Sequence, residues 1–190
     1  MTRTTEGNLD VLIVGAGPAG AVLSYLLSRE GIPVTLIERH HDFDREFRGE
    51  ILMPSGIEPF SQMGLEEQLN KVPHVTLDGV ELYANQKHLT TIAFNKELFG
   101  KYNPRWVSQP DLLEMLVGEC SQFKNFKLIR GTRVRELICE NNRVLGVIFD
   151  GDKRQEQLFA DIVIGTDGRK SRVRSSLGSS FRTDSMPMDI

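Results

Sequence analysis

The sequence is poor in cysteine and shows no excess of positive charge. Only Cys120 and Cys139 occur among its 190 residues, which excludes a disulfide framework and favours free thiols in a reducing cytoplasm. Lys and Arg together number 23 against 26 Asp and Glu, for a formal net charge of −3. A dedicated nucleic-acid-binding protein would carry a basic excess, so we expect no nucleic-acid partner.

Long uninterrupted hydrophobic runs are also absent. The apolar stretch at residues 11–27 is interrupted by three glycines and a proline, and it is shorter than the roughly 20 residues that a membrane span requires. Glu6 and Asp10 precede it, where a signal peptide would carry positive charge. We therefore predict a cytoplasmic protein without stable insertion into a membrane.

Metal-binding and nucleophile patterns are equally weak. His40, His41 and Asp42 are adjacent in the chain, so their side chains diverge, and no second cluster of His or Cys accompanies them. We predict no metal site. No set of nucleophile and base stands out, so the catalytic residues stay unassigned, and the single tryptophan, Trp106, is interpreted as packing in the core or beside a cofactor.

The sequence does contain a strand–helix–strand unit near its start. Residues 11–14 are apolar, as in a strand buried on both faces, residues 19–29 carry apolar side chains at helical spacing, and residues 33–38 form a second strand. The strands of such a unit are parallel, so we predict an α/β fold with a parallel sheet plus small antiparallel β elements. The other expected elements are helices at 57–69, 110–123 and 170–177, a hairpin of 79–84 with 89–94, and strands at 127–130, 133–139, 143–149 and 160–165.

A glycine fingerprint lies between the first strand and the helix. In Gly15-x-Gly17-x-x-Gly20, the first glycine allows a tight turn, the second lets the backbone approach a pyrophosphate, and the third lets helix and strand pack closely. Glu38 ends the second strand, where an acidic residue can accept hydrogen bonds from an adenosine ribose. The pattern predicts a Rossmann-like FAD/NAD(P)-binding fold, and it disfavours a 2′-phosphate at this site. The candidate cofactor-binding residues here are Gly15, Gly17, Pro18, Ala19, Gly20, Glu38 and Arg39.

A second motif follows the strand at 160–165. It reads Asp161-x-x-x-Gly165-x-Asp167-Gly168-x-x-Ser171-x-x-Arg174. With both motifs in place, the sequence resembles the FAD-dependent aromatic hydroxylases, the single-component flavoprotein monooxygenases related to p-hydroxybenzoate hydroxylase. Between them, Arg48-Gly49-Glu50 resembles the arginine segment of that family, and Gln109 resembles its cofactor-facing glutamine. The resemblance runs from about residue 9 to about residue 178.

The resemblance implies a role for each matching residue. The glycines would cradle the FAD pyrophosphate and Glu38 would hold the adenosine ribose. Arg48 would contact the phosphates or the ribityl chain, Gln109 would hydrogen-bond near that chain, and Asp167 with Gly168 would help to seat FAD and a transient NAD(P)H. Plainer interpretations remain open: a surface ion pair for Arg48, a helix-start residue for Gln109, and a simple turn for Asp167-Gly168. The basic run of Arg169, Lys170, Arg172 and Arg174 could attract a phosphate-bearing donor or form a solvated helix face.

The resemblance also implies an activity. NAD(P)H would reduce FAD, and the reduced flavin would react with dioxygen to give a hydroperoxide that hydroxylates a small organic substrate. Three alternatives stay open: a flavin-dependent reductase resembling the geranylgeranyl reductases, a non-catalytic FAD-binding module, and an NAD-dependent dehydrogenase. Halogenation is disfavoured, because the halogenase branch of the superfamily has a motif rich in tryptophan.

The resemblance also implies a division of the chain into two domains of unequal length. We expect residues 1–178 to form the FAD-binding domain, with a β excursion at 73–104 toward the substrate side, and residues 179–190 to begin a substrate domain. A third family motif, a Gly-Asp pair, would lie beyond Ile190, so the chain is expected to be the N-terminal half of a monooxygenase. The substrate, the choice of NADH or NADPH, and the oligomeric state are not predicted.

Overall fold

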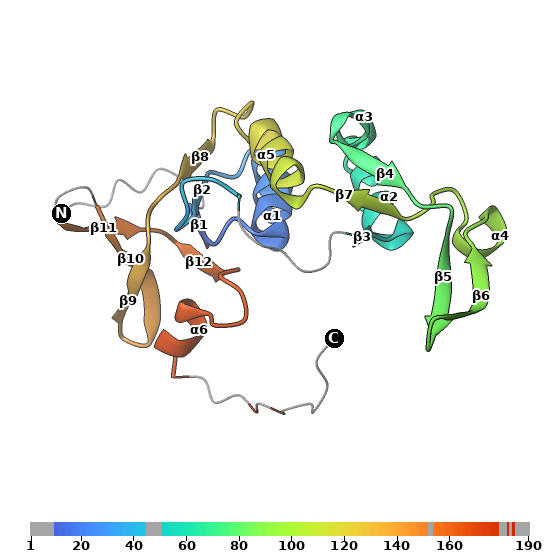
Figure 1. Cartoon of the computed structure of the whole chain (residues 1–190). Helices are drawn as coiled ribbons and strands as arrows, with labels where there is room; N and C mark the ends of the chain where they lie inside the picture. The colour runs from blue at the N-terminus through green and yellow to red at the C-terminus, as the bar shows by residue number, and fades with distance from the viewer. Residues whose placement is uncertain (1–9, 45–50, 152–153, 179–181, 183, 185–190) are drawn as a thin grey trace.

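A computed structural model describes residues 10–44, 51–151, 154–178, 182 and 184. Its centre is a four-stranded parallel sheet in the order β12-β1-β2-β8, formed by Ile162–Gly165, Val11–Val14, Val34–Ile37 and Phe126–Ile129. Helices α1 (Pro18–Arg29) and α5 (Gln109–Cys120) pack on one face of this sheet (Figure 1). The other face meets an antiparallel sheet of β11 (Gln155–Phe159), β10 (Arg143–Asp150) and β9 (Val134–Glu140). The predicted α/β class is confirmed.

The strand β1 is buried along its whole length because both faces of the parallel sheet are covered. Val11 and Ile13 join the core beneath the helices, whereas Leu12 and Val14 join a second core against the antiparallel sheet. Side chains alternate between the two faces of a strand, which explains this division. Each fully buried side chain of this size contributes roughly 1.5–3 kcal/mol to folding, so the strand that carries the glycine loop is firmly anchored.

The two ends of α1 follow from its sequence. Gly17 is the N-cap and Pro18 takes the first helical position, where its missing N–H costs nothing. At the other end, Gly31 adopts a φ of +80°, the left-handed conformation that favours glycine after a helix. The predicted strand–helix–strand unit is therefore confirmed.

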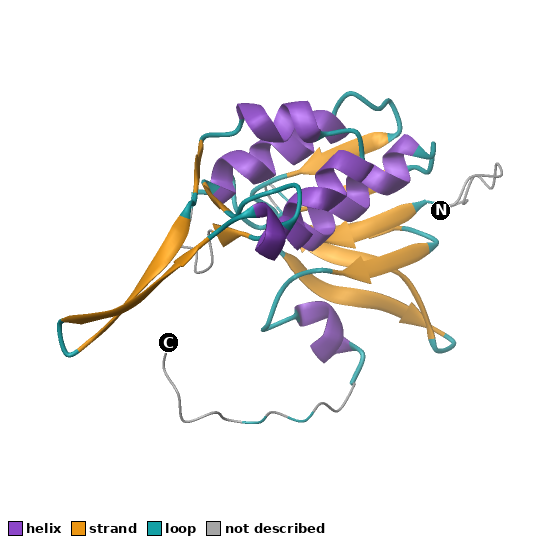
Figure 2. Ribbon diagram, turned by 90° about the vertical axis from the view of Figure 1, so that its right-hand side faces the viewer, coloured by secondary structure: helices purple, strands orange, loops and turns teal. Residues whose placement is uncertain are grey.

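Residues 51–107 form a second group of elements beside the parallel sheet (Figure 1). Helices α2 (Pro54–Gln62) and α3 (Glu66–Lys71) pack near a three-stranded sheet in the order β3-β7-β4, formed by Ile51–Leu52, Arg105–Val107 and His74–Thr76. The hairpin of β5 (Gly79–Ala84) and β6 (Lys87–Ala93) extends away from the rest of the chain and is followed by α4 (Lys96–Phe99) (Figure 2). These elements lie within residues 73–104, where an excursion toward the substrate side is predicted; that domain assignment stays a prediction.

Several expected elements differ in their bounds. The helix predicted over 57–69 is two helices, because the chain turns at Gly64, whose φ is +79°. Strand β6 begins at Lys87 rather than at residue 89, since Asn85 and Gln86 alone make the turn with φ values of 48° and 63°. Strand β11 was not predicted, and the helix expected at 170–177 shortens to α6 (Arg172–Ser176).

Membrane-spanning helices and metal-binding clusters were searched for among the described residues. Within residues 10–44, 51–151 and 154–178, no helix is long and apolar enough to cross a membrane. The same part of the chain shows no group of three His, Cys, Asp or Glu side chains placed to hold a metal ion. The domain boundary at residue 178 stays a prediction, because most of residues 179–190 lie outside the described residues.

Candidate functional site

The glycine loop joins the end of β1 to the start of α1, as the fingerprint predicts, and the structure gives its glycines different roles. Gly15 has a φ of +101°, and a Cβ built on it would lie 2.7 Å from the carbonyl oxygen of Thr166. A Cβ on Gly20 would overlap the carbonyl oxygen of Gly15. Packing within the protein therefore requires glycine at both of these positions.

Gly17 is not required by packing. Its φ is −68°, which any residue can adopt, and a Cβ built on it would meet nothing within 4 Å. Pro18 and Ala19, which follow it in the first turn of α1, are exposed. The backbone is thus open at Gly17, which lies at the N-terminus of a helix whose N–H groups and positive dipole end suit a phosphate.

Glu38 lies against the glycine loop rather than on the surface. Its side chain is 3% exposed, and its Oε2 accepts a hydrogen bond from the Ala16 N–H at 2.8 Å. Its Oε1 accepts a second from the His40 N–H at 3.1 Å. The carboxylate therefore holds the loop in place, and its contact with a ribose stays a prediction. The adjacent Arg39 is exposed, and its Nε lies 2.9 Å from Nε2 of His40.

The second motif lies directly beside the glycine loop. Thr166, which follows β12, donates its hydroxyl to the carbonyl oxygens of Val14 at 3.0 Å and Gly15 at 2.7 Å. These bonds join the two motifs, whose bonded residues are 151 and 152 positions apart in the sequence, at one edge of the sheet. Thr166 was not singled out from the sequence, because it occupies an unspecified position of the motif between Gly165 and Asp167.

Asp167 organises the turn into α6. Its Oδ1 accepts from the Ser171 hydroxyl at 2.5 Å, and its Oδ2 accepts from the N–H groups of Arg172 at 2.6 Å and Val173 at 3.1 Å. Gly168 takes a φ of +83°. The carboxylate thus satisfies backbone donors at the start of the helix, and its contact with a cofactor stays a prediction.

Gln109 is the first residue of α5, but it does not cap the helix. That role belongs to Ser108, whose hydroxyl accepts from the Asp111 N–H. The Oε1 of Gln109 is buried and has no hydrogen-bond partner among the described residues. Leaving such an oxygen unsatisfied costs about 1–3 kcal/mol, so this position favours a ligand that brings a donor. Arg48, the remaining candidate, lies outside the described residues.

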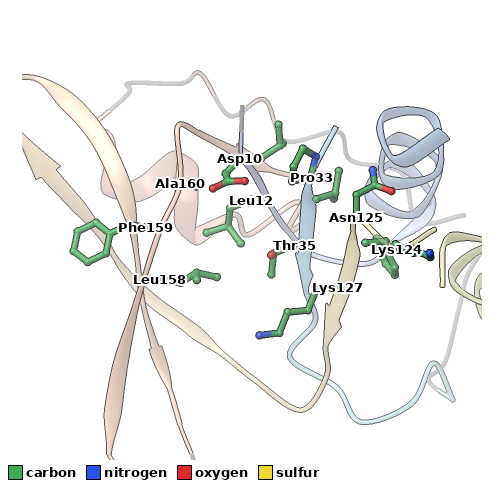
Figure 3. Close-up of a pocket in the computed structure, with 13 residues that line it drawn as sticks. Asp10, Leu12, Pro33, Thr35, Lys124, Asn125, Lys127, Leu158, Phe159 and Ala160 are labelled. Atoms are coloured by element: carbon green, nitrogen blue, oxygen red, sulfur yellow. The ribbon is translucent and has the colours of Figure 1, made fainter. Parts of the chain in front are cut away.

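A separate cavity of about 320 Å³ opens at the opposite end of the parallel sheet (Figure 3). It lies where the strands begin, among Asp10, Leu12, Pro33, Thr35, Lys127 and Leu158. Ligands of open α/β sheets bind outside the carboxyl ends of the strands, which is where the glycine loop, Glu38 and Thr166 lie. This cavity is therefore distinct from the candidate site.

Known proteins resemble this chain over nearly its whole length. Residues 8–190 match the family described as an FAD binding domain. The chain is 36% identical over 170 residues to 6-methylpretetramide 4-monooxygenase of Streptomyces rimosus, covering 89% of this chain and 40% of that protein. It is 33% identical over 175 residues to squalene epoxidase 4 of Arabidopsis thaliana, covering 90% and 34%.

Solved structures share the fold. The p-nitrophenol 4-monooxygenase PnpA of Pseudomonas putida superposes with a TM-score of 0.80 at 20% identity, covering 94% of this chain and 45% of that one. PqsL of P. aeruginosa superposes with a TM-score of 0.78 at 22% identity, covering 95% and 49%. The chain thus spans less than half the length of each of these four proteins.

Proposed function

This chain belongs to the FAD-binding domain family found in flavin-dependent monooxygenases, and we propose that it forms the FAD-binding part of an NAD(P)H-dependent monooxygenase acting on a small organic molecule. The family membership carries the proposal, and the geometry of the glycine loop and of Gln109 supports it. The monooxygenase activity is proposed for the whole protein, because this chain covers only 40% and 34% of the length of the two curated relatives.

The described residues fit FAD. The open space at Gly17 is a cradle that a side chain would fill, and it lies at the N-terminus of α1. The buried Oε1 of Gln109 lacks a donor that a ribityl hydroxyl would supply. Both observations are explained by one extended ligand that is anionic in its middle and carries hydroxyl groups.

The residues of this chain would bind and orient the cofactor rather than react. The N–H groups at the start of α1 would hold the pyrophosphate, and Gln109 would fix the ribityl chain. Glu38 would position the loop through Ala16 and meet the adenosine ribose. Bound FAD would supply electron transfer from NAD(P)H and activation of dioxygen for insertion of one oxygen atom into the substrate. Such redox chemistry belongs to the cofactor, and the protein supplies its orientation.

Two further observations support a nicotinamide electron donor and a small organic substrate. Arg169, Lys170 and Arg172 are exposed beside the Asp167 turn, where their charges suit the phosphates of a nicotinamide donor. The relatives are named for oxygenating 6-methylpretetramide and squalene, and PqsL has been solved with 2-aminobenzoylacetate. These names support a small organic substrate, and they do not favour the reductase or dehydrogenase alternatives.

The experiment that tests the proposal has two stages. First, the 190-residue chain is titrated with FAD and, separately, with NAD⁺ by isothermal calorimetry; we expect FAD to bind and NAD⁺ to bind far more weakly. Second, the longest natural protein that contains this chain is assayed for NAD(P)H oxidation and oxygen consumption with phenolic and polyketide substrates. A protein that binds FAD but never consumes oxygen with any electron donor would contradict the monooxygenase assignment.

A further inference from the structure

The peptide group between Gly15 and Ala16 is hydrogen-bonded at both of its ends to side chains from neighbouring strands. Its carbonyl oxygen accepts from the hydroxyl of Thr166, the residue that follows β12, at 2.7 Å. Its N–H, which belongs to Ala16, donates to Oε2 of Glu38, the residue that follows β2, at 2.8 Å. Strands β12 and β2 lie on either side of β1 (Figure 1). The peptide is therefore held from both sides of the strand that carries the glycine loop.

These two partners favour a single orientation of the peptide. A peptide plane can rotate about the backbone bonds that flank it, and Gly15 permits a wide rotation because it has no Cβ. If the plane turned over, the Gly15 carbonyl oxygen would face the Glu38 carboxylate, and two acceptors cannot form a hydrogen bond with each other. The Thr166 hydroxyl stabilises the observed orientation because it donates its hydrogen to that carbonyl oxygen.

The Thr166 hydroxyl also lies where the first turn of α1 packs on the glycine loop. A Cβ built on Gly20 would lie 2.7 Å from Oγ1 of Thr166, and it would overlap the Gly15 carbonyl oxygen. The hydroxyl, the carbonyl and the start of the helix are thus packed closely together. A movement of the Gly15 carbonyl would therefore displace the start of α1.

The start of α1 is where the proposed function places the FAD pyrophosphate. The first N–H groups of a helix have no partner within the helix. Here they belong to Gly17, Ala19 and Gly20, because Pro18 carries no N–H. These groups directly follow the peptide between residues 15 and 16 in the chain, so their positions relative to a bound pyrophosphate depend on the orientation of that peptide.

We propose that Thr166 is a positioning residue for FAD, which acts through the Gly15 carbonyl to hold the N–H groups at the start of α1 in the arrangement that a pyrophosphate requires. The inference rests on the proposed function, since it deepens the assignment of the glycine loop to FAD. Loss of the Thr166 hydrogen bond should raise the dissociation constant for FAD by about fivefold. The dissociation constant for ADP should rise by the same factor, because ADP shares the pyrophosphate and the adenosine with FAD.

The test uses four forms of the 190-residue chain: wild type, Thr166→Val, Thr166→Ser and the control Ser121→Ala. Valine keeps the branched shape of threonine without the donor, whereas serine keeps the hydroxyl. Ser121 caps the C-terminal end of α5, and its hydroxyl likewise donates to a backbone carbonyl, that of Val117 at 2.8 Å. Each form is checked for folding by circular dichroism. Hydrogen exchange of the Ala16 amide is then followed by NMR without FAD, and FAD and ADP are titrated by calorimetry.

We expect only Thr166→Val to differ from the wild type. Its Ala16 amide should exchange about fivefold faster, and it should bind FAD and ADP about fivefold more weakly. Unchanged exchange or unchanged FAD affinity in a folded Thr166→Val variant overturns the inference, as does a loss of affinity for FAD without a loss for ADP. A Thr166→Ser variant that behaves like Thr166→Val also overturns it, because the hydroxyl would then not be the group that acts.

The wild type gives a second measurement that needs no substitution. Without FAD, its Ala16 amide should exchange slowly, whereas the amide of the exposed Ala19 should exchange rapidly and become protected when FAD is added. Equal exchange rates of the two amides without FAD overturn the inference even if Thr166→Val does not fold. Failure of the folded wild type to bind FAD counts against the proposed function, while the exchange measurements still decide whether Thr166 holds the peptide.

Discussion

Replacing Gly17 with alanine should weaken FAD binding without unfolding the protein. Gly17 is the one glycine of the fingerprint at which an added Cβ would meet nothing within 4 Å, so this substitution tests the cofactor contact separately from packing. A methyl group on Gly17 would contact no other part of the described chain. We expect it to take up space that a pyrophosphate bound at the first N–H groups of α1 would need.

The expected change in stability is small because two effects offset each other. Gly17 is the N-cap of α1, and alanine is a poorer N-cap than glycine by about 0.5 kcal/mol. Its φ of −68° and ψ of −179° are open to alanine, and replacing glycine at such a position stabilises a protein by about 0.4–1 kcal/mol through the unfolded chain. The free energy of unfolding without FAD should therefore change by less than about 0.5 kcal/mol.

The expected change in FAD affinity is much larger. If the methyl group separates the pyrophosphate from one backbone N–H, it removes one charge-assisted hydrogen bond, which is worth about 1.5–3 kcal/mol. The dissociation constant for FAD should then rise by about ten- to a hundredfold. The assay is a calorimetric FAD titration paired with urea unfolding of the same preparation in the absence of FAD.

Gly20→Ala is the matched control, because its Cβ would overlap the Gly15 carbonyl oxygen. Overpacking of this kind costs about 1–3 kcal/mol, so Gly20→Ala should be destabilised even without FAD. A folded Gly17→Ala variant that binds FAD as tightly as the wild type would show that the cofactor does not approach the chain at Gly17.

Three further predictions concern the groups around the site and the core. Glu38→Gln should lower the free energy of unfolding without FAD by about 1–3 kcal/mol, measured by urea unfolding, because the buried carboxylate accepts two backbone N–H groups and an amide nitrogen accepts none. Asp167→Ala should cost about 0.5–2 kcal/mol in the same measurement, because it removes the acceptor for the N–H groups that begin α6. Burial raises the pKa of Cys120 to about 12, so at pH 8 a disulfide reagent should titrate only the exposed Cys139 until denaturant is added.

Each of these predictions has a contrary result. Unchanged stability of Glu38→Gln would mean that the glycine loop does not depend on the carboxylate. Loss of FAD binding by Asp167→Ala at full stability would assign that carboxylate to the cofactor alone. Rapid reaction of two thiols in the native protein would place Cys120 within reach of solvent.

The part of the fold that could be predicted from sequence is the part that local pattern determines. Residues 11–38 combine a β-branched apolar run, a proline at the helix start and a glycine at the helix end, and each of these restricts the backbone within a few residues. The glycine fingerprint adds a specific turn. Strand, helix and strand therefore lie within one or two residues of their predicted bounds.

The rest depends on contacts between distant segments. Strands β3, β4 and β7 have only two or three residues each, and they exist because Trp106 and its neighbours pair with residues far along the chain. Strand β11 reads QEQLF, a mostly polar run that forms a strand because it pairs with β10. Such pairing cannot be predicted from a local sequence pattern, because the tendency of a segment to form a strand depends on its packing against the neighbouring strand.

The candidate site shows the same division. The sequence pattern places Gly15, Gly17 and Gly20 correctly in a strand–turn–helix, but it does not reveal that only Gly17 faces open space. The pattern predicts Glu38 as a site residue but does not predict that its side chain is buried. It also does not identify Thr166, whose hydroxyl joins the two motifs. These features arise where β1, β2 and β12 end side by side, so only the assembled sheet displays them.

A calorimetric titration of the folded 190-residue chain with FAD, repeated with Gly17→Ala and Gly20→Ala, tests the cofactor site most directly. We expect one FAD bound per chain, and we expect Gly17→Ala to lower the affinity by about ten- to a hundredfold while the unfolding curve of this variant matches that of the wild type. A folded wild-type chain that binds no FAD, or that binds it equally well after the Gly17 substitution, would contradict the assignment of this loop as the cofactor site.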